Sequence, residues 1–425
     1  MKKFLVFLFL IAAFSMIVSA ATVNLTMFVG DATAGRLLKH SVSVYEQSHP
    51  DVKIDVVVLP YYGGFMQKIA LSIAGHTLPD LVQITTAYMP RVSKYLINMA
   101  PYIEKTFNMS TENYKSQIIP SMIAFLGNKD EILAVPLETT TECIWINKKM
   151  FEKAGILPPP LNGQTETTWT WDQFISALKK VKEVNHIPYA LSYDYSADRF
   201  YNFLAIWGVT VLDEKENFVL DKYPQAAKLF DTFISLFKDR IIPPAEWLSG
   251  ASAQRDFFEG ITAAYWSGSW QGSAVLRQEK QVGGDYVPAY IPKGKIWFGE
   301  PGGSFLAAFK TSNKQKEKAA IAFVTWMANK DKGYLTYIKP GLQLSAYKDQ
   351  MIDYGIVKMN DWEKTYGTLL SRAPAWTMLD RANAIWSKLY NLIRKQIALG
   401  IAGQVTGKEI IQNLKKSYEG IVGKK

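Results

Sequence analysis

The sequence predicts an α/β fold built around a mainly parallel sheet. Strand-like and helix-like segments alternate from residue 23 onward, which is the pattern of strands joined by covering helices. The chain has 425 residues, well above the ~150 of a typical single domain, so we expect two domains or one large one. Its residues are 48% hydrophobic and 20% charged, a balance typical of a folded globular chain rather than a disordered one.

The first elements are predicted from periodicity. Val23–Val29 alternates apolar and polar residues, which indicates a strand with one buried face. A helix is expected over Ala34–Gln47 and ends before Pro50. Val52–Leu59 is rich in β-branched residues and predicts a second strand, and a glycine-rich turn then leads into a helix over Phe65–Ala74.

Residues that follow strands are the first candidates for a site. Leu81–Ile84 predicts a third strand, and Gly75 is expected to form the left-handed cap of the helix before it. In parallel sheets ligands bind at the carboxyl ends of strands. That rule points to the residues just after the second and third strands, which are Tyr61, Tyr62, Thr85 and Thr86.

The rest of the chain continues the alternation and contains no internal repeat. The last hundred residues are predicted to be mostly helical, and the Pro- and Gly-rich stretch 288–303 is expected to interrupt the chain. Other expected elements are strands over Ile132–Pro136, Cys143–Ile146 and Ile261–Trp266, and helices over Lys148–Ala154, Gln173–Glu183 (with Thr170 as N-cap) and Gln225–Phe237.

Residues 1–20 have the features of a secretory signal peptide. Two lysines precede an apolar run over Phe4–Val18, and small residues follow at a cleavage site before Ala21. The run is shorter than the ~20 residues that cross a bilayer. No cysteine stands at the cleavage site, so we expect a soluble protein exported to the periplasm without a lipid anchor there.

Composition excludes several kinds of chemistry. A single cysteine, Cys143, and four scattered histidines predict no disulfide framework, no metal site and no cofactor. The formal charge of +10 is dispersed, and export removes nucleic acid as a partner, although the basic excess keeps acidic sugars open as ligands. No HExxH, GxSxG or Walker motif is present.

Six stretches, in order, resemble family 1 of the bacterial extracellular solute-binding proteins, the ABC-transporter receptors that include maltose-binding protein. They are HTLPDLVQ (76–83), VPLETTTECIWINKKMFEKAGI (135–156), TWTWDQF (168–174), FFEGITAAYWSGSW (257–270), GGSFLAAFK with KEKAAIAFVTWM (302–327) and GQVTGKEIIQNL (403–414). Tyr265, Trp266 and Trp145 depart from the family pattern, which leaves the shape of the pocket open.

The resemblance implies a two-lobed periplasmic-binding-protein fold of type II that closes on a ligand by a hinge. Lobe one would comprise residues 22–137 and 303–347, and lobe two residues 138–302 and 348–425. The implied function is a monomeric, non-enzymatic receptor that delivers a carbohydrate to an ABC permease. The aromatic content of 13% favours an oligosaccharide. A secreted glycoside hydrolase-like enzyme, which needs two carboxylates across the scissile bond, and a lectin without transport are the alternatives.

A sugar site needs aromatic plates for C–H faces and fixed polar groups for hydroxyls. The resemblance implies that Trp270 and Trp376 stack on the ligand, with core packing as the alternative. Arg372 is expected to bind a hydroxyl or carboxylate, or else to pair with a surface acid. The remaining candidates are Thr85 and Thr86 (or helix caps), Tyr61 and Tyr62 (cleft entrance), Glu138 and Thr140 (ligand acceptors or hinge residues), and Gly302 and Gly303 (close backbone approach). Asp194, Asp198 and Tyr193 are expected on a polar surface loop, with a place in the cleft as the alternative.

Overall fold

The computed structural model describes residues 22–60, 64–350, 357–374, 376–379 and 383–423. The signal peptide predicted over residues 1–20 lies outside these ranges. In them the strands are β1 Val23–Val29, β2 Val52–Val58, β3 Leu81–Thr85, β4 Val135–Asn147, β5 Leu191–Tyr193, β6 Ala264–Gly268, β7 Tyr286–Ala289 and β8 Pro301–Ala308.

Nineteen labelled α-helices and three short 3₁₀ helices accompany the described strands. The helices are α1 Ala32–Ser48, α2 Met66–Ala74, α3 Met89–Val92, α4 Ala100–Phe107, α5 Thr111–Ser116, α6 Pro120–Ile123, α7 Lys148–Lys153, α8 Trp171–Asn185, α9 Ala197–Ala205, α10 Ala226–Lys238, α11 Pro244–Leu248, α12 Ala253–Phe258, α13 Gly272–Val282, α14 Lys314–Met327, α15 Gly333–Gly341, α16 Val357–Ser371, α17 Trp376–Leu379, α18 Ala384–Ile401 and α19 Gly407–Val422; the 3₁₀ turns are η2 Ser93–Tyr95, η3 Leu220–Lys222 and η4 Ser269–Gln271. Within the described chain, no helix combines the length and apolar character needed to cross a membrane.

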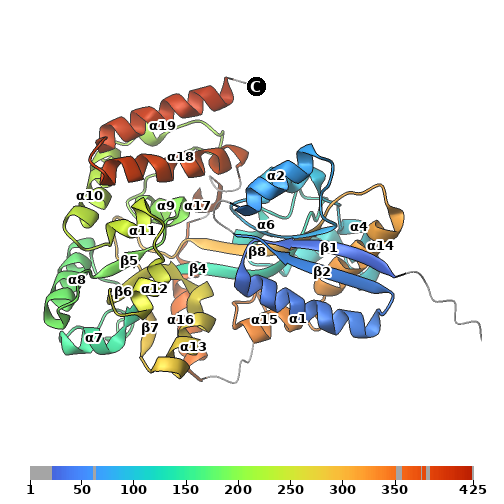
Figure 1. Ribbon diagram of the computed structural model, residues 1–425, viewed down its shortest axis with the longest axis horizontal. Helices are drawn as coiled ribbons and strands as arrows, with labels where there is room; N and C mark the ends of the chain where they lie inside the picture. The colour runs from blue at the N-terminus through green and yellow to red at the C-terminus, as the bar shows by residue number, and fades with distance from the viewer. Residues whose placement is uncertain (1–21, 61–63, 351–356, 375, 380–382, 424–425) are drawn as a thin grey trace, which may run out of the picture.

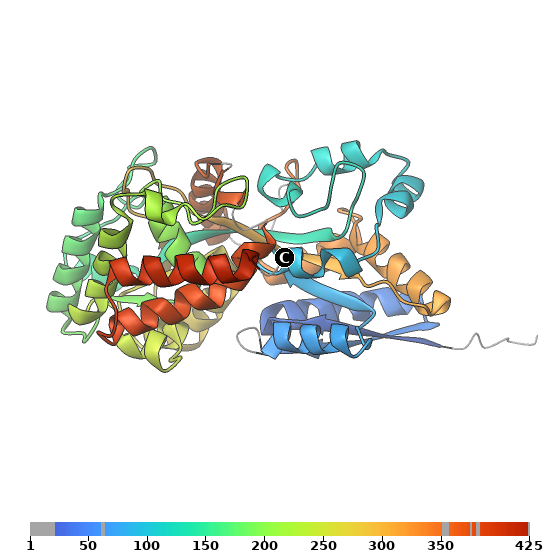
Figure 2. The same cartoon turned by 90° about the horizontal axis from the view of Figure 1, so that it is seen from above.

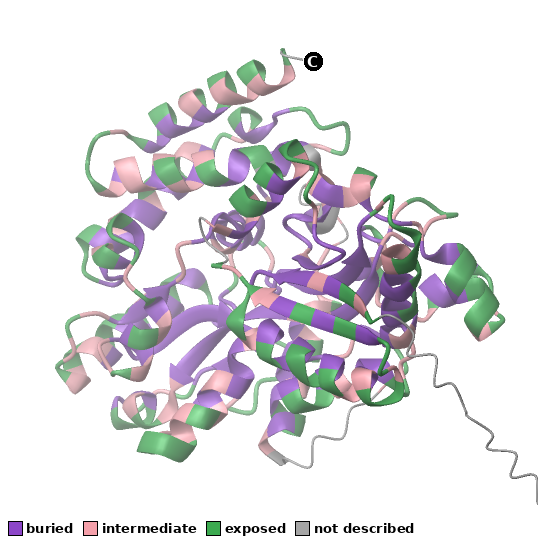
Figure 3. Ribbon diagram, turned by 45° about the vertical axis from the view of Figure 1, so that its right-hand side comes forward, coloured by how far each residue is buried: buried purple, intermediate pink, exposed green. Residues whose placement is uncertain are grey.

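Two separate hydrophobic cores organise the molecule. One contains buried side chains from residues 25–137 and 305–347, and the other contains buried side chains from residues 143–298 and 344–414. The two bodies lie side by side in Figures 1 and 2, joined in the middle by β4 and β8. Buried residues concentrate on the strands, and the outer faces of the helices are exposed (Figure 3).

The sheet is mixed, so the prediction of a mainly parallel sheet is wrong. Its order is β2-β1-β3-β8-β4-β6-β5, with β7 also paired to β4. Of the described pairs, β1 with β2, β1 with β3 and β5 with β6 are parallel, while the pairs of β8 with β3 and of β4 with β8, β6 and β7 are antiparallel. The reason is that β4 carries the chain from the first core to the second and β8 carries it back.

The crossing strand β4 is one continuous element of 13 residues. Its first half pairs with β8 from Val135 to Thr141, and its second half pairs with β6 from Glu142 to Ile146. Residues 135–136 of the strand predicted over 132–136 and the whole strand predicted over 143–146 therefore belong to one strand, because the polar residues between them remain in the ladder, whereas residues 132–134 lie outside it. The stretch around residue 301, expected to interrupt the chain, begins strand β8.

Most local predictions agree with the structure. The helix that follows Thr170 begins with a capping box in which the Thr170 hydroxyl accepts from the Gln173 N–H. The left-handed cap predicted at Gly75 is wrong, since Gly75 has φ −88° and the next residue, His76, has φ +54°. The helix ends at Ala74 as predicted, but the left-handed residue is His76, one position after the glycine.

Candidate ligand-binding cavity

A cavity of about 450 Å³ lies between the two cores, where β4 and β8 cross. This volume is within the range of small-molecule sites. Its lining from the first core and β8 comprises Asp31, Ala32, Thr33, Ala34, Gln83, Thr85, Thr86, Ala87, Tyr337, Gln343, Glu300, Pro301, Gly302 and Gly303; its lining from β4 and the second core comprises Glu138, Thr140, Glu142, Asp194, Ser196, Asp198, Arg199, Gln254, Trp270, Gln271, Ala274, Arg277 and Tyr390.

The structure brings seven of the predicted site residues to this cavity. They are Thr85, Thr86, Glu138, Thr140, Trp270, Gly302 and Gly303. Tyr61 and Tyr62 lie outside the described residues. Trp376 and Arg372 do not line the cavity in the described part of the chain: Trp376 packs against the second core, and Arg372 pairs with the exposed Glu166 at 3.0 Å and lies over the Trp297 ring.

Strand β4 lines the cavity with one of its two faces, because alternate side chains of a strand point to the same side. Glu138, Thr140 and Glu142 stand two residues apart, so their side chains share one face of the strand. All three line the cavity, the first two beside β8 and the last beside β6. One strand therefore presents polar groups to the ligand space from both halves of the molecule.

Two glycines let β8 lie close to β4. A Cβ on Gly303 would lie 2.5 Å from the Glu138 carbonyl oxygen, and one on Gly302 would lie 2.7 Å from the Thr140 hydroxyl. Any side chain at either position would push the strands apart or fill the cavity. The Gly303 carbonyl also accepts from the Thr86 N–H, which joins the end of β3 to the crossing.

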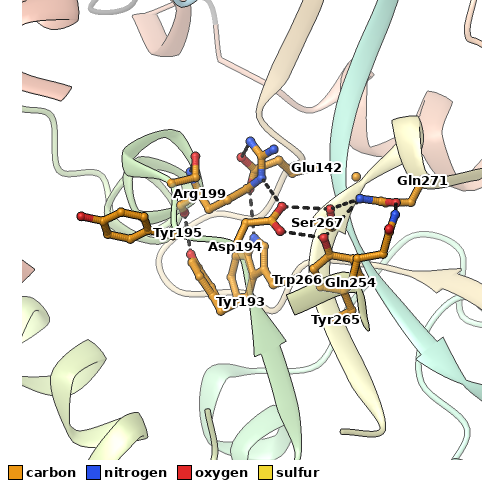
Figure 4. Close-up of polar contacts among 12 residues, drawn as sticks. Glu142, Tyr193, Asp194, Tyr195, Arg199, Gln254, Tyr265, Trp266, Ser267 and Gln271 are labelled. Atoms are coloured by element: carbon orange, nitrogen blue, oxygen red, sulfur yellow. Dashed lines mark hydrogen bonds and ion pairs between the residues drawn. The ribbon is translucent and has the colours of Figure 1, made fainter. Parts of the chain in front are cut away.

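Arg199 is the centre of a charge network in the second core (Figure 4). It lies on α9, and its guanidinium contacts Glu142 Oε1 at 3.2 Å and Asp194 Oδ2 at 3.5 Å. The same guanidinium lies 4.1 Å from the centroid of the Trp270 ring. Arg199 thereby fixes two carboxylates and the indole beside the cavity.

Neutral donors complete this network. The Tyr265 hydroxyl donates to Asp194 at 2.6 Å, and the Ser267 hydroxyl donates to the second oxygen of Asp194 at 3.1 Å. The Trp266 indole donates to Glu142 at 3.0 Å. Tyr265 and Trp266, which depart from the family pattern, therefore hold two of the carboxylates that border the cavity, those of Asp194 and Glu142.

Trp270 lies at the cavity wall just beyond the end of β6. Its ring covers Gly268, where a Cβ would overlap the indole and come within 2.6 Å of the Thr141 carbonyl oxygen. Arg199 lies against the indole as well. The position of this aromatic plate is thus set by a glycine on its own strand and by a cation from α9.

Glu138 titrates near neutral pH. Burial raises its pKa from the ordinary 4.5 to about 7, and the charge of Asp31 adds to the rise. The hydroxyls of Ser304, at 3.0 Å, and Tyr337, at 3.3 Å, donate to it and oppose the shift. Among the described residues, no group of three or more His, Cys, Asp or Glu side chains is placed to hold a metal ion.

The two bodies also touch beside the cavity. Tyr88, which precedes α3, and Tyr390, on α18, contact each other edge-on with ring centroids 6.4 Å apart. Both are buried, and the Tyr390 hydroxyl bonds the Ser196 hydroxyl at 3.1 Å. Because Tyr390 and Ser196 line the cavity, the contact between the two bodies lies next to its lining.

Sequence reasoning missed several lining residues. Asp194 and Asp198, expected on a surface loop, border the cavity, and Arg199, Glu142 and Glu300 were not singled out. A signal was available for Glu142, since a period-two row of polar residues inside an apolar strand indicates a face that is wet or functional. No local pattern identifies Glu300 or Arg199.

Known proteins share this architecture. An ABC substrate-binding protein of Listeria monocytogenes, solved in complex with cycloalternan, matches with TM-score 0.79 and 18% identity, covering 95% of this chain and 99% of that one. A mannitol-binding protein of Pseudomonas aeruginosa is 23% identical over 328 residues, 72% of this chain and 70% of the relative. The two-lobed fold of type II expected from the sequence is confirmed.

The family assignment rests on the sequence itself. A binding protein of Brucella abortus is 22% identical over 222 residues, and this chain spans about half of that relative's length. The family model described as bacterial extracellular solute-binding protein matches residues 28–334, more than half of the chain. The chain belongs to the bacterial extracellular solute-binding protein family.

Proposed function

We propose that the chain is the substrate-binding receptor of an ABC importer and that its cavity binds a carbohydrate. The observation that carries the proposal is the cavity itself, which is lined from both cores by hydrogen-bonding side chains with one indole among them. Ionised carboxylates accept from ligand hydroxyls, amides and guanidiniums donate to ligand oxygens, and Trp270 offers a flat apolar surface to a sugar face.

The relatives support this ligand class. One is named for mannitol, and the Listeria protein was solved with cycloalternan, so polyols and oligosaccharides both occur among similar proteins. We take the lobes to be residues 22–137 with 303–347 and residues 138–302 with 348–425. The two hydrophobic cores support this division. Closure of the lobes on a sugar would create the shape that a permease recognises.

The proposal includes a receptor that acts in the periplasm as a monomer and catalyses no reaction. Its test is a thermal-shift and tryptophan-fluorescence screen of the mature chain against neutral sugars, oligosaccharides and polyols, with the mass of each compound measured afterwards. A ligand at one hundred times its Kd adds ~2.7 kcal/mol, a shift of roughly a few degrees. A selective shift with the glycan intact supports the receptor, a cleaved glycan supports a hydrolase, and silence throughout the panel contradicts the proposal.

Two tryptophan variants test the site. Trp270→Ala is expected to weaken the selected sugar about tenfold or more, because it removes a ring that lines the cavity. Trp376→Ala is the matched control, since Trp376 packs against the second core away from the cavity lining. Equal losses in both variants, or no loss in Trp270→Ala, would contradict the assignment of Trp270 as the stacking surface.

A further inference from the structure

The charge of the cavity is opposite to the charge of the chain. Six carboxyl groups line it, those of Asp31, Glu138, Glu142, Asp194, Asp198 and Glu300, against two guanidiniums, those of Arg199 and Arg277. Glu138, with its pKa raised to about 7, is only partly ionised at neutral pH, so the other five carry most of the negative charge. The chain as a whole has 48 basic and 38 acidic residues. The basic excess that keeps acidic sugars open as ligands is therefore not located at the cavity.

We infer that the cavity selects its ligand by charge, binding neutral and amino sugars and rejecting uronic acids and sugar phosphates of the same skeleton. The inference rests on the proposed function, because it concerns which carbohydrate enters the proposed site. It excludes the acidic sugars that the basic excess of the chain had kept open as ligands.

The positive charge of Arg199 is already engaged. Its guanidinium contacts Glu142 at 3.2 Å and Asp194 at 3.5 Å, and one face of it lies against Trp270. A ligand anion that bound Arg199 would compete with two carboxylates fixed by Trp266, Tyr265 and Ser267. Breaking such pairs strands buried charge, which costs more than the new contact returns.

The remaining carboxylates lie on both sides of the ligand space. Asp31 is the N-cap of α1 in the first body, and Asp198 accepts from the Trp386 indole in the second. Glu300 immediately precedes β8 and is 2% exposed. A ligand held between the bodies therefore meets carboxylates from both bodies.

The titration of buried groups agrees with this local field. After burial, the charge of Asp31 contributes to the raised pKa of Glu138. For Tyr193, after burial, the charges of Glu142, Glu300 and Asp194 raise the pKa further, against the opposing effect of Arg199. At Tyr193 three carboxylates act in one direction and one guanidinium in the other, which agrees with the excess of acidic groups in the cavity lining.

The negative charge of the cavity does not disfavour the contacts that a neutral sugar needs. Ligand hydroxyls donate to ionised carboxylates without adding charge. A protonated amino group gains from the same carboxylates. Like-charge contacts at an interface are costly enough to set specificity by themselves.

The test uses sugars in sets of three that share one skeleton. The probes are glucose, glucosamine and glucuronate, the corresponding galactose and mannose sets, and cellobiose with its amino and uronate counterparts, each titrated by calorimetry at pH 7. In a set whose neutral member binds, the uronate is expected to bind about tenfold more weakly or worse, and the amino sugar at least as tightly. A uronate that binds as well as its neutral partner overturns the inference while the proposed function stands. Silence in every set, after a silent panel of larger glycans, overturns the proposed function and the inference together.

Two variants locate the effect. Asp31→Asn removes one charge and keeps a side chain that caps helices well, so the variant should fold. It should reduce the discrimination against the uronate about threefold, with a smaller change for the neutral sugar. Glu300→Gln should act in the same direction. Asp361→Asn is the control, because it makes the same charge change at a side chain that is 70% exposed on α16. Equal effects of Asp31→Asn and Asp361→Asn would show that net charge, not the cavity lining, sets the preference.

Discussion

Replacing Arg199 with methionine tests whether one guanidinium holds the charge network beside the cavity. Arg199 is 14% exposed, and its partners Glu142 and Asp194 are 2% and 18% exposed. Methionine keeps much of the aliphatic volume and removes the charge. The variant therefore leaves two largely desolvated carboxylates without their shared cation.

The size of the effect follows from the burial of these groups. Breaking a buried ion pair from one side costs about 3–5 kcal/mol, because the remaining charge stays out of water. The lost contact with Trp270 adds about 0.5–2 kcal/mol. Proton uptake by the stranded carboxylates offsets part of this. We expect Arg199→Met to lower the free energy of unfolding of the second body by about 3–5 kcal/mol at pH 7.

Urea unfolding followed by tryptophan fluorescence and circular dichroism measures this loss, and a double-mutant cycle with Glu142→Gln identifies its source. The double variant should lose less than the sum of the two single variants. The pKa of a stranded carboxylate rises above its unfolded value, so the native variant binds protons more strongly and regains stability as the pH falls.

Three results would refute this reasoning: a loss below about 1 kcal/mol, full additivity in the cycle, or an equal loss at pH 5 and pH 8. The control is Lys364→Met. It removes a cation from an exposed pair with Asp361, whose contribution should be about 0–1 kcal/mol.

Three further outcomes are expected. Gly303→Ala should destabilise the protein by about 1–3 kcal/mol, because its Cβ would lie 2.5 Å from the Glu138 carbonyl oxygen. Gly367→Ala, at an exposed helical site with nothing within 4 Å, should instead stabilise it by about 0.5–1 kcal/mol, and urea unfolding of both variants measures the two effects. The raised pKa of Glu138 contributes stability that is complete below pH 4.5 and is lost as the pH rises through about 7, so Glu138→Gln should not show this loss. The free energy of unfolding of both proteins, measured from pH 4.5 to 8, tests this, and the same pH dependence in the two proteins would contradict the shift. Tyr88→Ala should speed sugar dissociation about two- to tenfold by removing the ring contact with Tyr390, while Tyr88→Phe should not; equal rates in stopped-flow fluorescence would exclude this contact from closure.

Local patterns predicted the elements of the first body well. Val23–Val29 and Val52–Val58 are strands because their alternation and β-branched content match one buried face, and the structure confirms both. In the second body, Thr170 was equally predictable as a helix cap, because its capping contacts lie within four residues. The sheet direction could not be predicted in this way, because the place of β8 between β3 and β4 depends on residues 160 or more positions apart in the chain.

The site residues that the sequence could predict are those at the end of a strand or within a family motif. Thr85 and Thr86 were found from the carboxyl end of β3, and Trp270 from the motif that contains Gly268. Arg199 was not found, because its partners come from β4 and from the end of β5 and are distant in sequence. For Arg372 the sequence left two alternatives, a ligand contact or a pair with a surface acid, and the structure pairs it with the exposed Glu166.

The position of the site on the crossing strands limits which contacts can drive closure. Glu138, Thr140 and Glu142 all belong to β4, so a ligand that bound these residues alone would keep the same contacts whether the two bodies were open or closed. A ligand shifts such an equilibrium only through contacts that differ between the two states. Those contacts must come from residues that belong to one body each, such as Asp31 on one side and Trp270 on the other. A ligand too short to bridge these two residues should therefore bind with low affinity and leave the bodies apart, and a ligand that reaches both should close them.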